Sequence, residues 1–231
     1  MARCSAEPLL PGMEISVSSL LSVVDHLVYA AVVMDDGCRL VAEALGIPPS
    51  PGGQHPRWGT RNALLSLGPT VYLEVMGPDR SARDPLRPRP FGLDGTAGSA
   101  TSRPRLVTWA ARSGDLERVV AIARADGVDL GEVQAGSRER PDGSTLAWRM
   151  TDLATPRESG IVPFFIDWGD TPHPGAAAPG GCTLEDLRLF APDSARIQRI
   201  LERMGISVVV RDGPPAIEAV IRTPRGMVTL R

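Results

Sequence analysis

The chain has 231 residues, of which 42% are hydrophobic and 23% charged, and its formal net charge is −2. These values are ordinary for a soluble globular protein of one large domain or two small ones, and they give no electrostatic reason to expect nucleic acid as a partner. All 25 residues counted as lysine or arginine are arginine. The absence of lysine excludes Schiff-base chemistry and a lysine-containing phosphate loop.

The cysteines and one apolar segment near the N-terminus indicate the compartment. The three cysteines are widely spaced and form no C-x-x-C pair, so we predict neither a disulfide framework nor a cysteine zinc site, and a reducing environment fits. The apolar run 15–34 carries Asp25 and His26 at its centre, and both groups would be costly in hydrocarbon. We therefore expect a cytoplasmic protein with no membrane span and with a small molecule as its partner.

A first βαβββ module is predicted over residues 22–76, after a tail and lead-in of residues 1–21. β-Branched and aromatic residues predict a strand from Val23 to Tyr29. Because strand side chains alternate between faces, His26 is expected on the face opposite Asp25. The module continues with a helix, a loop rich in proline and glycine, and two strands, over residues 38–46, 47–53, 60–67 and 71–76.

The last strand of this module combines a carboxylate with large side chains. Tyr72, Glu74 and Met76 share one face, while Val71, Leu73 and Val75 make the opposite face purely apolar. The apolar face is expected to pack on helices. The mixed face is typical of a strand that lines a ligand cup.

The order of these motifs resembles the glyoxalase-like branch of the vicinal oxygen chelate superfamily, over about residues 23–173. The motifs are a strand with Asp25-His26, a helix, Gly52-Gly53-Gln54-His55, Gly59-Thr60-Arg61-Asn62 and a strand with Tyr72-Leu73-Glu74. The resemblance implies an α+β fold of repeated βαβββ modules, paired to form a curved mixed sheet around a cup with helices outside. Members include isomerases, lyases, dioxygenases, epimerases and drug-sequestering proteins, so the fold leaves the reaction open.

Residues 77–105 are dense in proline, glycine and arginine and are predicted as a linker or a lid. Phe91-Gly92-Leu93 is the part expected to fold over the cup if the segment is a lid. Residues 106–173 are predicted as a second βαβββ module that pairs with the first to form the cup. Residues 174–231 are predicted as a third βαβββ-like module, which leaves a homodimer possible.

The resemblance places His26 and Glu74 near positions that carry metal ligands in related proteins. Together with His55 they would form a two-histidine, one-carboxylate set suited to a divalent Zn, Fe, Mn or Ni ion. Glu74 or His55 would then also act as the catalytic proton acceptor. The second module departs from the metal pattern, because its first strand offers Thr108 and Trp109 in place of a histidine.

Six residues are further candidates for substrate binding: Trp58, Asn62, Tyr72, Trp109, Asp167 and His173. Structural roles are alternatives for several candidates. His26 and Asp25 would then form a hydrogen-bonded pair, Glu74 would pair with an arginine, and Asp167 would be a structural carboxylate. His173 would then cap its loop by bonding to backbone.

Three functions follow from these candidates. The first is a metal-assisted isomerase, lyase or dioxygenase acting on a small oxygenated organic molecule. The second is a metal-free protein of the bleomycin-resistance type that binds or sequesters a planar ligand between apolar residues. That lining would consist of Trp58, Tyr72, Trp109, Phe165 and Trp168. The third is an inactive scaffold that serves only for association.

Overall fold

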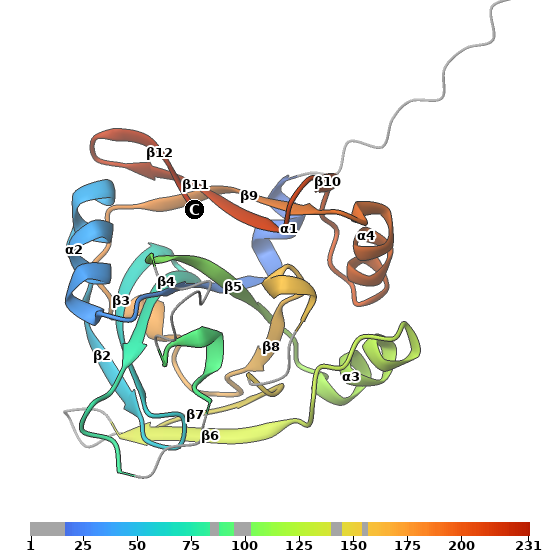
Figure 1. Cartoon of the computed structure of the whole chain (residues 1–231), viewed down its shortest axis with the longest axis horizontal. Coiled ribbons are helices and arrows are strands. Elements are labelled where there is room, and N and C mark those ends of the chain that lie inside the picture. The colour runs from blue at the N-terminus through green and yellow to red at the C-terminus, as the bar shows by residue number, and fades with distance from the viewer. Residues whose placement is uncertain (1–16, 84–87, 95–102, 140–144, 154–156) are drawn as a thin grey trace, which may run out of the picture.

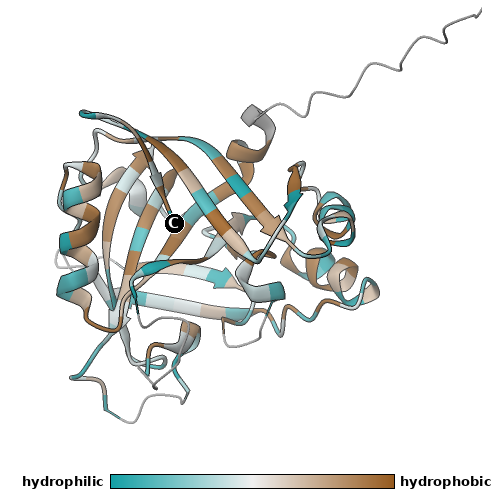
Figure 2. Cartoon of the chain, turned by 45° about the horizontal axis from the view of Figure 1, so that its top comes forward, coloured by the Kyte–Doolittle hydropathy of each residue, from teal (hydrophilic) through white to brown (hydrophobic). Residues whose placement is uncertain are grey.

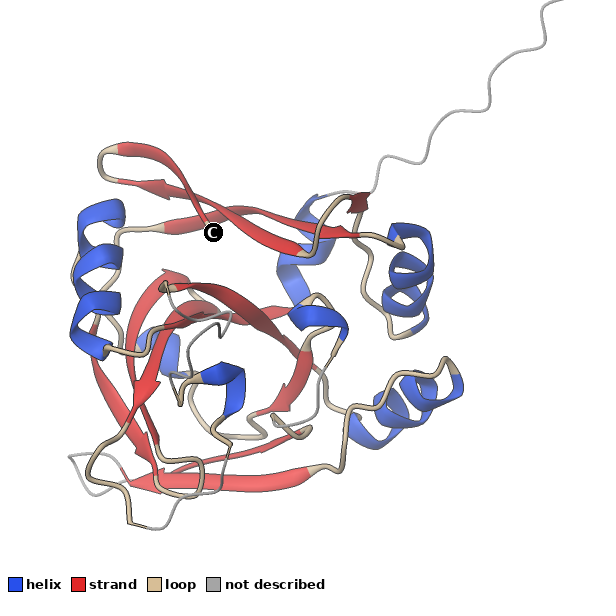
Figure 3. Cartoon of the chain, viewed as in Figure 1, coloured by secondary structure: helices blue, strands red, loops and turns tan. Residues whose placement is uncertain are grey.

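In the computed structural model, the described residues are 17–83, 88–94, 103–139, 145–153 and 157–231. Two βαβββ modules share one eight-stranded mixed sheet, which curls around a central space with helices outside (Figures 1 and 3). The fold class expected from the sequence is therefore confirmed. The first module consists of β1 (Val24–Ala30), α2 (Met34–Leu45), β2 (Ser50–His55), β3 (Thr60–Gly68) and β4 (Val71–Pro78). The second consists of β5 (Arg105–Arg112), α3 (Leu116–Ala125), β6 (Gln134–Glu139), β7 (Thr145–Met150) and β8 (Phe164–Asp167).

The two modules join through their first strands. The strand order is β2-β3-β4-β1-β5-β8-β7-β6, with β1 antiparallel to β5 and parallel to β4. Both faces of β1 are covered, because its seven residues are all buried. One face packs on the helices in the main hydrophobic core, and the other points into the curled sheet. The metal-ligand candidates His26 on β1 and Glu74 on β4 therefore lie at the centre of the fold.

Helix boundaries follow local signals in the sequence. Gly46 ends α2 in a left-handed conformation with φ of 78°, and its N–H bonds to the carbonyl of Ala42. Asp115 precedes α3, and its side chain accepts from the backbone N–H of Arg118. The end of α2 agrees with the predicted helix of residues 38–46.

A smaller four-stranded sheet covers the outside of the curled sheet (Figure 1). Its strand order is β10-β9-β11-β12, so β9 pairs with both β10 and β11. Hydrophobic and hydrophilic residues alternate along these strands (Figure 2), and their buried side chains join the same core as the outer face of the large sheet. The elements are β9 (Thr183–Ala191), α4 (Ser194–Arg203), β10 (Val210–Asp212), β11 (Ala216–Thr223) and β12 (Gly226–Leu230).

Two segments differ from their predicted structure. Residues 47–53 were expected to form a loop, but the edge strand β2 begins at Ser50. Pro51 is tolerated there because an edge strand makes hydrogen bonds on one side alone. Near the N-terminus, where a lead-in was expected, α1 (Val17–Val23) precedes β1, and Leu20 packs into the main core.

The described part of segment 77–105 folds back into the curled sheet. A short turn, Pro90–Gly92, lies within the ring of strands in Figure 1, and the following Leu93 is 1% exposed in the inner hydrophobic cluster. Arg89 fixes the turn by donating to the carbonyl of Gly59 (2.7 Å) and pairing with Asp94 (2.8 Å). Within the described residues, no helix has the length and apolar character of a membrane span.

Candidate active site

A cavity of about 250 Å³ lies inside the curled sheet. Its lining side chains come from strands of both modules and from the loop after β2. Ligand sites in proteins usually enclose about 300–1,000 Å³, so this cavity is near the small end of that range. The cavity therefore suits a small molecule, or one end of a larger one.

Asp25 is the extra residue of a β-bulge. Val24 pairs with Ala111 and His26 with the adjacent Ala110, so Asp25 has no partner across β5. A bulge interrupts the alternation of side chains and re-aims them. Consequently Asp25 and His26, which alternation would place on opposite faces, bond to each other.

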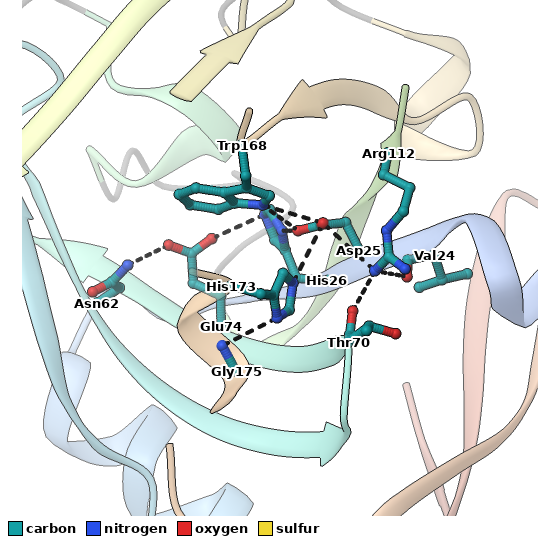
Figure 4. Close-up of polar contacts among 10 residues, drawn as sticks. All are labelled: Val24, Asp25, His26, Asn62, Thr70, Glu74, Arg112, Trp168, His173 and Gly175. Atoms are coloured by element: carbon teal, nitrogen blue, oxygen red, sulfur yellow. Dashed lines mark hydrogen bonds and ion pairs between the residues drawn. The ribbon is translucent and has the colours of Figure 1, made fainter. Parts of the chain in front are cut away.

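Four side chains surround the fully buried carboxylate of Asp25 (Figure 4). His26 Nδ1 lies 2.8 Å away, and Trp168 Nε1 donates at 3.2 and 3.3 Å to the two oxygens. His173 Nε2 lies at 3.4 Å and Arg112 at 3.6 Å. Burial alone would raise the pKa of Asp25, but hydrogen bonds from His173 and His26 and their charges lower this pKa well below its usual value.

The ionised state of Asp25 fixes the tautomer of His26. An ionised carboxylate only accepts hydrogen bonds, so the Nδ1 of His26 carries a proton. The other ring nitrogen, Nε2, lies 3.6 Å from Glu74 Oε2. His26 Nε2 and Glu74 Oε2 therefore face each other at the cavity wall.

Asn62 orients Glu74. The backbone N–H of Gly53 donates to Asn62 Oδ1 at 2.7 Å, so the amide nitrogen points away from Gly53 and donates to Glu74 Oε1 at 2.6 Å. The ionic contact of Glu74 in this network is to His26, not to an arginine as the structural alternative supposed. One carboxylate oxygen is thus held by the amide, and the other faces the histidine.

His55 contacts Asn62 rather than Glu74. Its Nδ1 lies 3.0 Å from Thr60 Oγ1, and its Nε2 lies 3.5 Å from Asn62 Nδ2. Burial lowers the pKa of His55, although the charge of Glu74 opposes this effect. A neutral imidazole fits these contacts, with Nδ1 as donor to Thr60 and Nε2 facing the amide.

The predicted metal ligands do not form a three-ligand site as they lie. Across the part of the chain that the structure describes, no group of three or more His, Cys, Asp or Glu side chains could hold a metal ion. His26 and Glu74 offer two donors 3.6 Å apart, but the amide of Asn62 contacts both Glu74 and His55. These residues therefore do not fit a metal ion in this arrangement.

Three of the predicted substrate-binding residues, Trp58, Asn62 and Tyr72, line the cavity. The ring of Tyr72 stacks on His26 with centroids 4.6 Å apart. Burial, followed by the charges of Glu74 and Asp25, raises the pKa of Tyr72 well above its usual value, so its phenol stays protonated. His173 is outside the lining and packs against Asp25, and its Nδ1 accepts from Gly175 N at 3.3 Å.

Two predicted positions face away from the cavity. Trp109 is fully buried in the main core, where its indole N–H donates to the carbonyl of Ile161 at 2.9 Å. Its neighbour Ala110 points inwards instead, opposite His26. Asp167 is not in the lining and accepts from the N–H of Gly169 at 2.9 Å.

The same reversal affects the predicted apolar lining. Phe165 packs in the main core, while Phe164 and Ile166 face inwards. The inward and outward faces of β5 and β8 are the reverse of those expected, because both faces of these strands are buried and hydrophobic character does not distinguish them.

Sequence reasoning also missed residues of the second module that line the cavity, above all Trp148 and Arg138. Trp148 lies directly across the β6–β7 pair from Gly136, and a Cβ on Gly136 would come within 2.5 Å of the indole. Glycine is needed there because the indole covers its backbone. A glycine and a tryptophan on two consecutive strands were the available signal.

Comparisons with known proteins agree with the fold. A sequence model of the family described as "Glyoxalase-like domain" matches residues 24–205, whereas no curated protein matches the chain. A hypothetical protein from Staphylococcus aureus is similar in structure, with 13% identity, coverage of 89% of this chain and 83% of that chain, and a TM-score of 0.56.

Methylmalonyl-CoA epimerase structures are more distant. The one from Mycobacterium tuberculosis has 17% identity, coverage of 64% of this chain and 88% of its own, and a TM-score of 0.37. A variant from Streptomyces coelicolor in complex with 2-nitronate-propionyl-CoA has 15% identity, coverage of 65% and 97%, and a TM-score of 0.39. The family match spans most of the sequence, and the paired βαβββ modules are present in the structure. The chain therefore belongs to the glyoxalase-like domain family, within the vicinal oxygen chelate superfamily.

Proposed function

We propose that this protein is an enzyme that transfers a proton on a small oxygenated organic molecule, with Glu74 and His26 as the acid–base pair. The observation that carries the proposal is the 3.6 Å approach of His26 Nε2 to Glu74 Oε2 at the wall of the cavity, with Nδ1 committed to Asp25. Two groups that hold one proton between them are suited to accept a second proton and to return it.

Each residue of the network has a definite part in this reaction. When the shared proton is on His26, Glu74 is an ionised carboxylate and accepts a proton from a C–H or O–H group of the substrate. The pair then holds two protons. Return of one proton to a neighbouring carbon completes an isomerisation. Return to the opposite face of the same carbon, after the planar carbanion has turned over in the cavity, completes an epimerisation. Departure of a leaving group from the carbon next to the carbanion completes an elimination.

The surrounding residues orient His26 and Glu74 and shield them from water. Asp25 holds the tautomer and direction of the imidazole, in the way a buried carboxylate orients a histidine base. Asn62 holds one oxygen of Glu74. Aromatic side chains around the pair exclude water, which strengthens electrostatic interactions inside the cavity.

Deuterium exchange tests the proposal without knowledge of the natural substrate. Small carbonyl compounds, neutral and charged, are incubated with the protein in D₂O, and loss of each C–H signal next to a carbonyl is followed by NMR. We expect exchange with the wild type and a loss of about 10²–10⁴-fold in Glu74→Gln. Glu43→Gln, on the exposed face of α2, is the matched control and should keep the wild-type rate. Equal rates in wild type and Glu74→Gln would refute the role of Glu74.

A metal-assisted form of the reaction, with His26, Glu74 and His55 as ligands, remains a prediction from the sequence. It would require the amide of Asn62 to leave its contacts with Glu74 and His55. Elemental analysis of protein purified without chelator, compared with His26→Ala and Glu74→Ala, tests it. Stoichiometric metal that both substitutions remove would support this form, and equal metal content in all three proteins would contradict it.

Metal-free sequestration is a second candidate function, favoured by the aromatic character of the walls. Trp148 and Trp168 lie with ring centroids 5.5 Å apart, and Phe164 lies edge-on to His26. Such surfaces bind planar ligands without any reaction. Tight binding that quenches tryptophan fluorescence in the presence of chelator, together with no exchange in D₂O, would favour this function over the enzyme.

A further inference from the structure

Arg138 closes the seam of the curled sheet. Strands β2 and β6 are the two outermost strands of the sheet order, and the curl brings them together (Figure 1). Arg138 extends from β6 across this seam, where its guanidinium donates to the carbonyl of Gly52 on β2 at 3.2 Å. The same side chain lines the cavity. The approach of β6 to β2 therefore places the positive charge of Arg138 at the cavity.

The two glycines of β2 make this approach possible. A Cβ on Gly53 would lie 2.7 Å from the side chain of Arg138, and a Cβ on Gly52 would lie 2.2 Å from Asn62 Oδ1. Gly53 also donates its N–H to Asn62, which in turn orients Glu74. Arg138 therefore lies next to Gly53, which is the start of the hydrogen-bonded network that positions Glu74.

The charged side chains of the cavity favour an anion. Among the described residues of the lining, Glu74 is the one acidic residue and Arg57 and Arg138 are the two arginines. The charge of Glu74 is balanced when the shared proton is on His26. Arg57 is exposed at the loop after β2, with its guanidinium 5.3 Å from the ring of Trp58.

We propose that the site takes a small planar carboxylate, whose carboxylate group binds Arg138 with help from Arg57 and whose reacting carbon lies at Glu74 and His26. The proposal concerns the substrate class of the same site. Only the reaction of the bound molecule, and not the binding of its carboxylate, rests on the proposed function. A guanidinium presents five N–H donors in a fixed fork that matches a carboxylate. The apolar part of such a ligand would lie between the aromatic walls, and the cavity volume limits its size.

Benzoate and its neutral, nearly isosteric counterpart benzamide are the probes. Their affinities are measured by quenching of tryptophan fluorescence for the wild type, Arg138→Gln and Arg61→Gln. Arg61 is a matched control, because it is an exposed arginine on β3 that pairs with Asp35 and is not part of the lining. We expect benzoate to bind the wild type at least about tenfold more tightly than benzamide, since charge-assisted hydrogen bonds exceed neutral ones by this order.

Arg138→Gln should weaken benzoate binding more than benzamide binding and so remove this preference, while Arg61→Gln should behave as the wild type. A urea unfolding midpoint equal to that of the wild type shows that the variant is folded. Equal affinities of wild type for the two probes, no binding of benzoate at about 10 mM, or an undiminished preference in Arg138→Gln would overturn the proposal.

Glu74→Gln separates this proposal from that of the reaction. A preference for benzoate that persists in Glu74→Gln, with no deuterium exchange in any protein, would uphold the carboxylate site and reject the acid–base function. Exchange in the wild type without a preference for benzoate would uphold the acid–base function and reject the carboxylate site.

Discussion

Replacing Asp25 by asparagine tests whether a buried charge holds the site together. The substitution keeps the shape of the side chain, removes the charge and turns one acceptor oxygen into a donor amide. The fully buried carboxylate accepts from His26 at 2.8 Å and from Trp168 at 3.2 Å. Hydrogen bonds to charged groups contribute about 1.5–3 kcal/mol each, and breaking a buried ion pair costs about 3–5 kcal/mol. We therefore expect Asp25→Asn to lower the free energy of unfolding by about 3–5 kcal/mol.

Urea unfolding at pH 7 measures this change, with Asp167→Asn as control. Asp167 accepts one hydrogen bond from the N–H of Gly169 at the surface, so its substitution should cost less than about 1 kcal/mol. A loss below about 1 kcal/mol in Asp25→Asn would refute the claim that the charge of Asp25 stabilises the fold.

The pH dependence of unfolding gives a second readout on the same residue. Because folding lowers the pKa of Asp25, its stabilising contribution is fully present above the unfolded carboxyl pKa of about 4. The contribution is lost as pH falls from there through the lower folded pKa. The difference in unfolding free energy between wild type and Asp25→Asn should therefore shrink on acidification below about pH 4. A difference that stays constant down to the acid transition would contradict the depressed pKa.

Three further changes have distinct expected results. Folding lowers the pKa of His55, so the unfolded chain binds more protons below about pH 6.5, and His55→Gln should reduce the loss of stability between pH 7 and pH 5 measured by urea unfolding. Gly136→Ala should weaken benzoate binding, measured by fluorescence titration, because the new Cβ displaces Trp148 from the wall. Trp109→Phe should cost about 1–3 kcal/mol of stability, because the buried carbonyl of Ile161 loses its donor, yet leave benzoate affinity unchanged.

The sequence was sufficient for the fold class and for the cavity-facing side of β4. Tyr72, Glu74 and Met76 line the cavity as their alternation predicted, because β4 is regular and one of its faces is purely apolar. The paired βαβββ modules followed from the order of strands and helices together with the family resemblance. These features depend on local periodicity, which a single sequence displays.

The remaining features depend on pairing between strands. Asp25 reaches the site because of a bulge opposite β5, and a bulge is defined by two strands rather than by one. Arg138 reaches it because the curl of the whole sheet brings β6 to β2. Trp109 was misplaced because both faces of β5 are buried, so hydrophobicity does not distinguish inside from outside.

The register of the sheet explains how one row of residues forms the polar network of the site. His26 lies opposite Tyr72 on β4, while Glu74 lies opposite Val28, so the histidine and the carboxylate are diagonal neighbours. Asn62 is likewise diagonal to Glu74, because it lies opposite Met76.

Diagonal positions on neighbouring strands bring the polar ends of long side chains into contact. The residues directly opposite on the neighbouring strand stack or pack beside these side chains. Tyr72 does this for His26, with its ring parallel to the imidazole within 17°. The polar row thus runs obliquely across four adjacent strands, from Gly53 near the seam to the buried charge of Asp25. A shift of β4 by one residue would turn Glu74 into the apolar core, so the network and the apolar packing specify the same register.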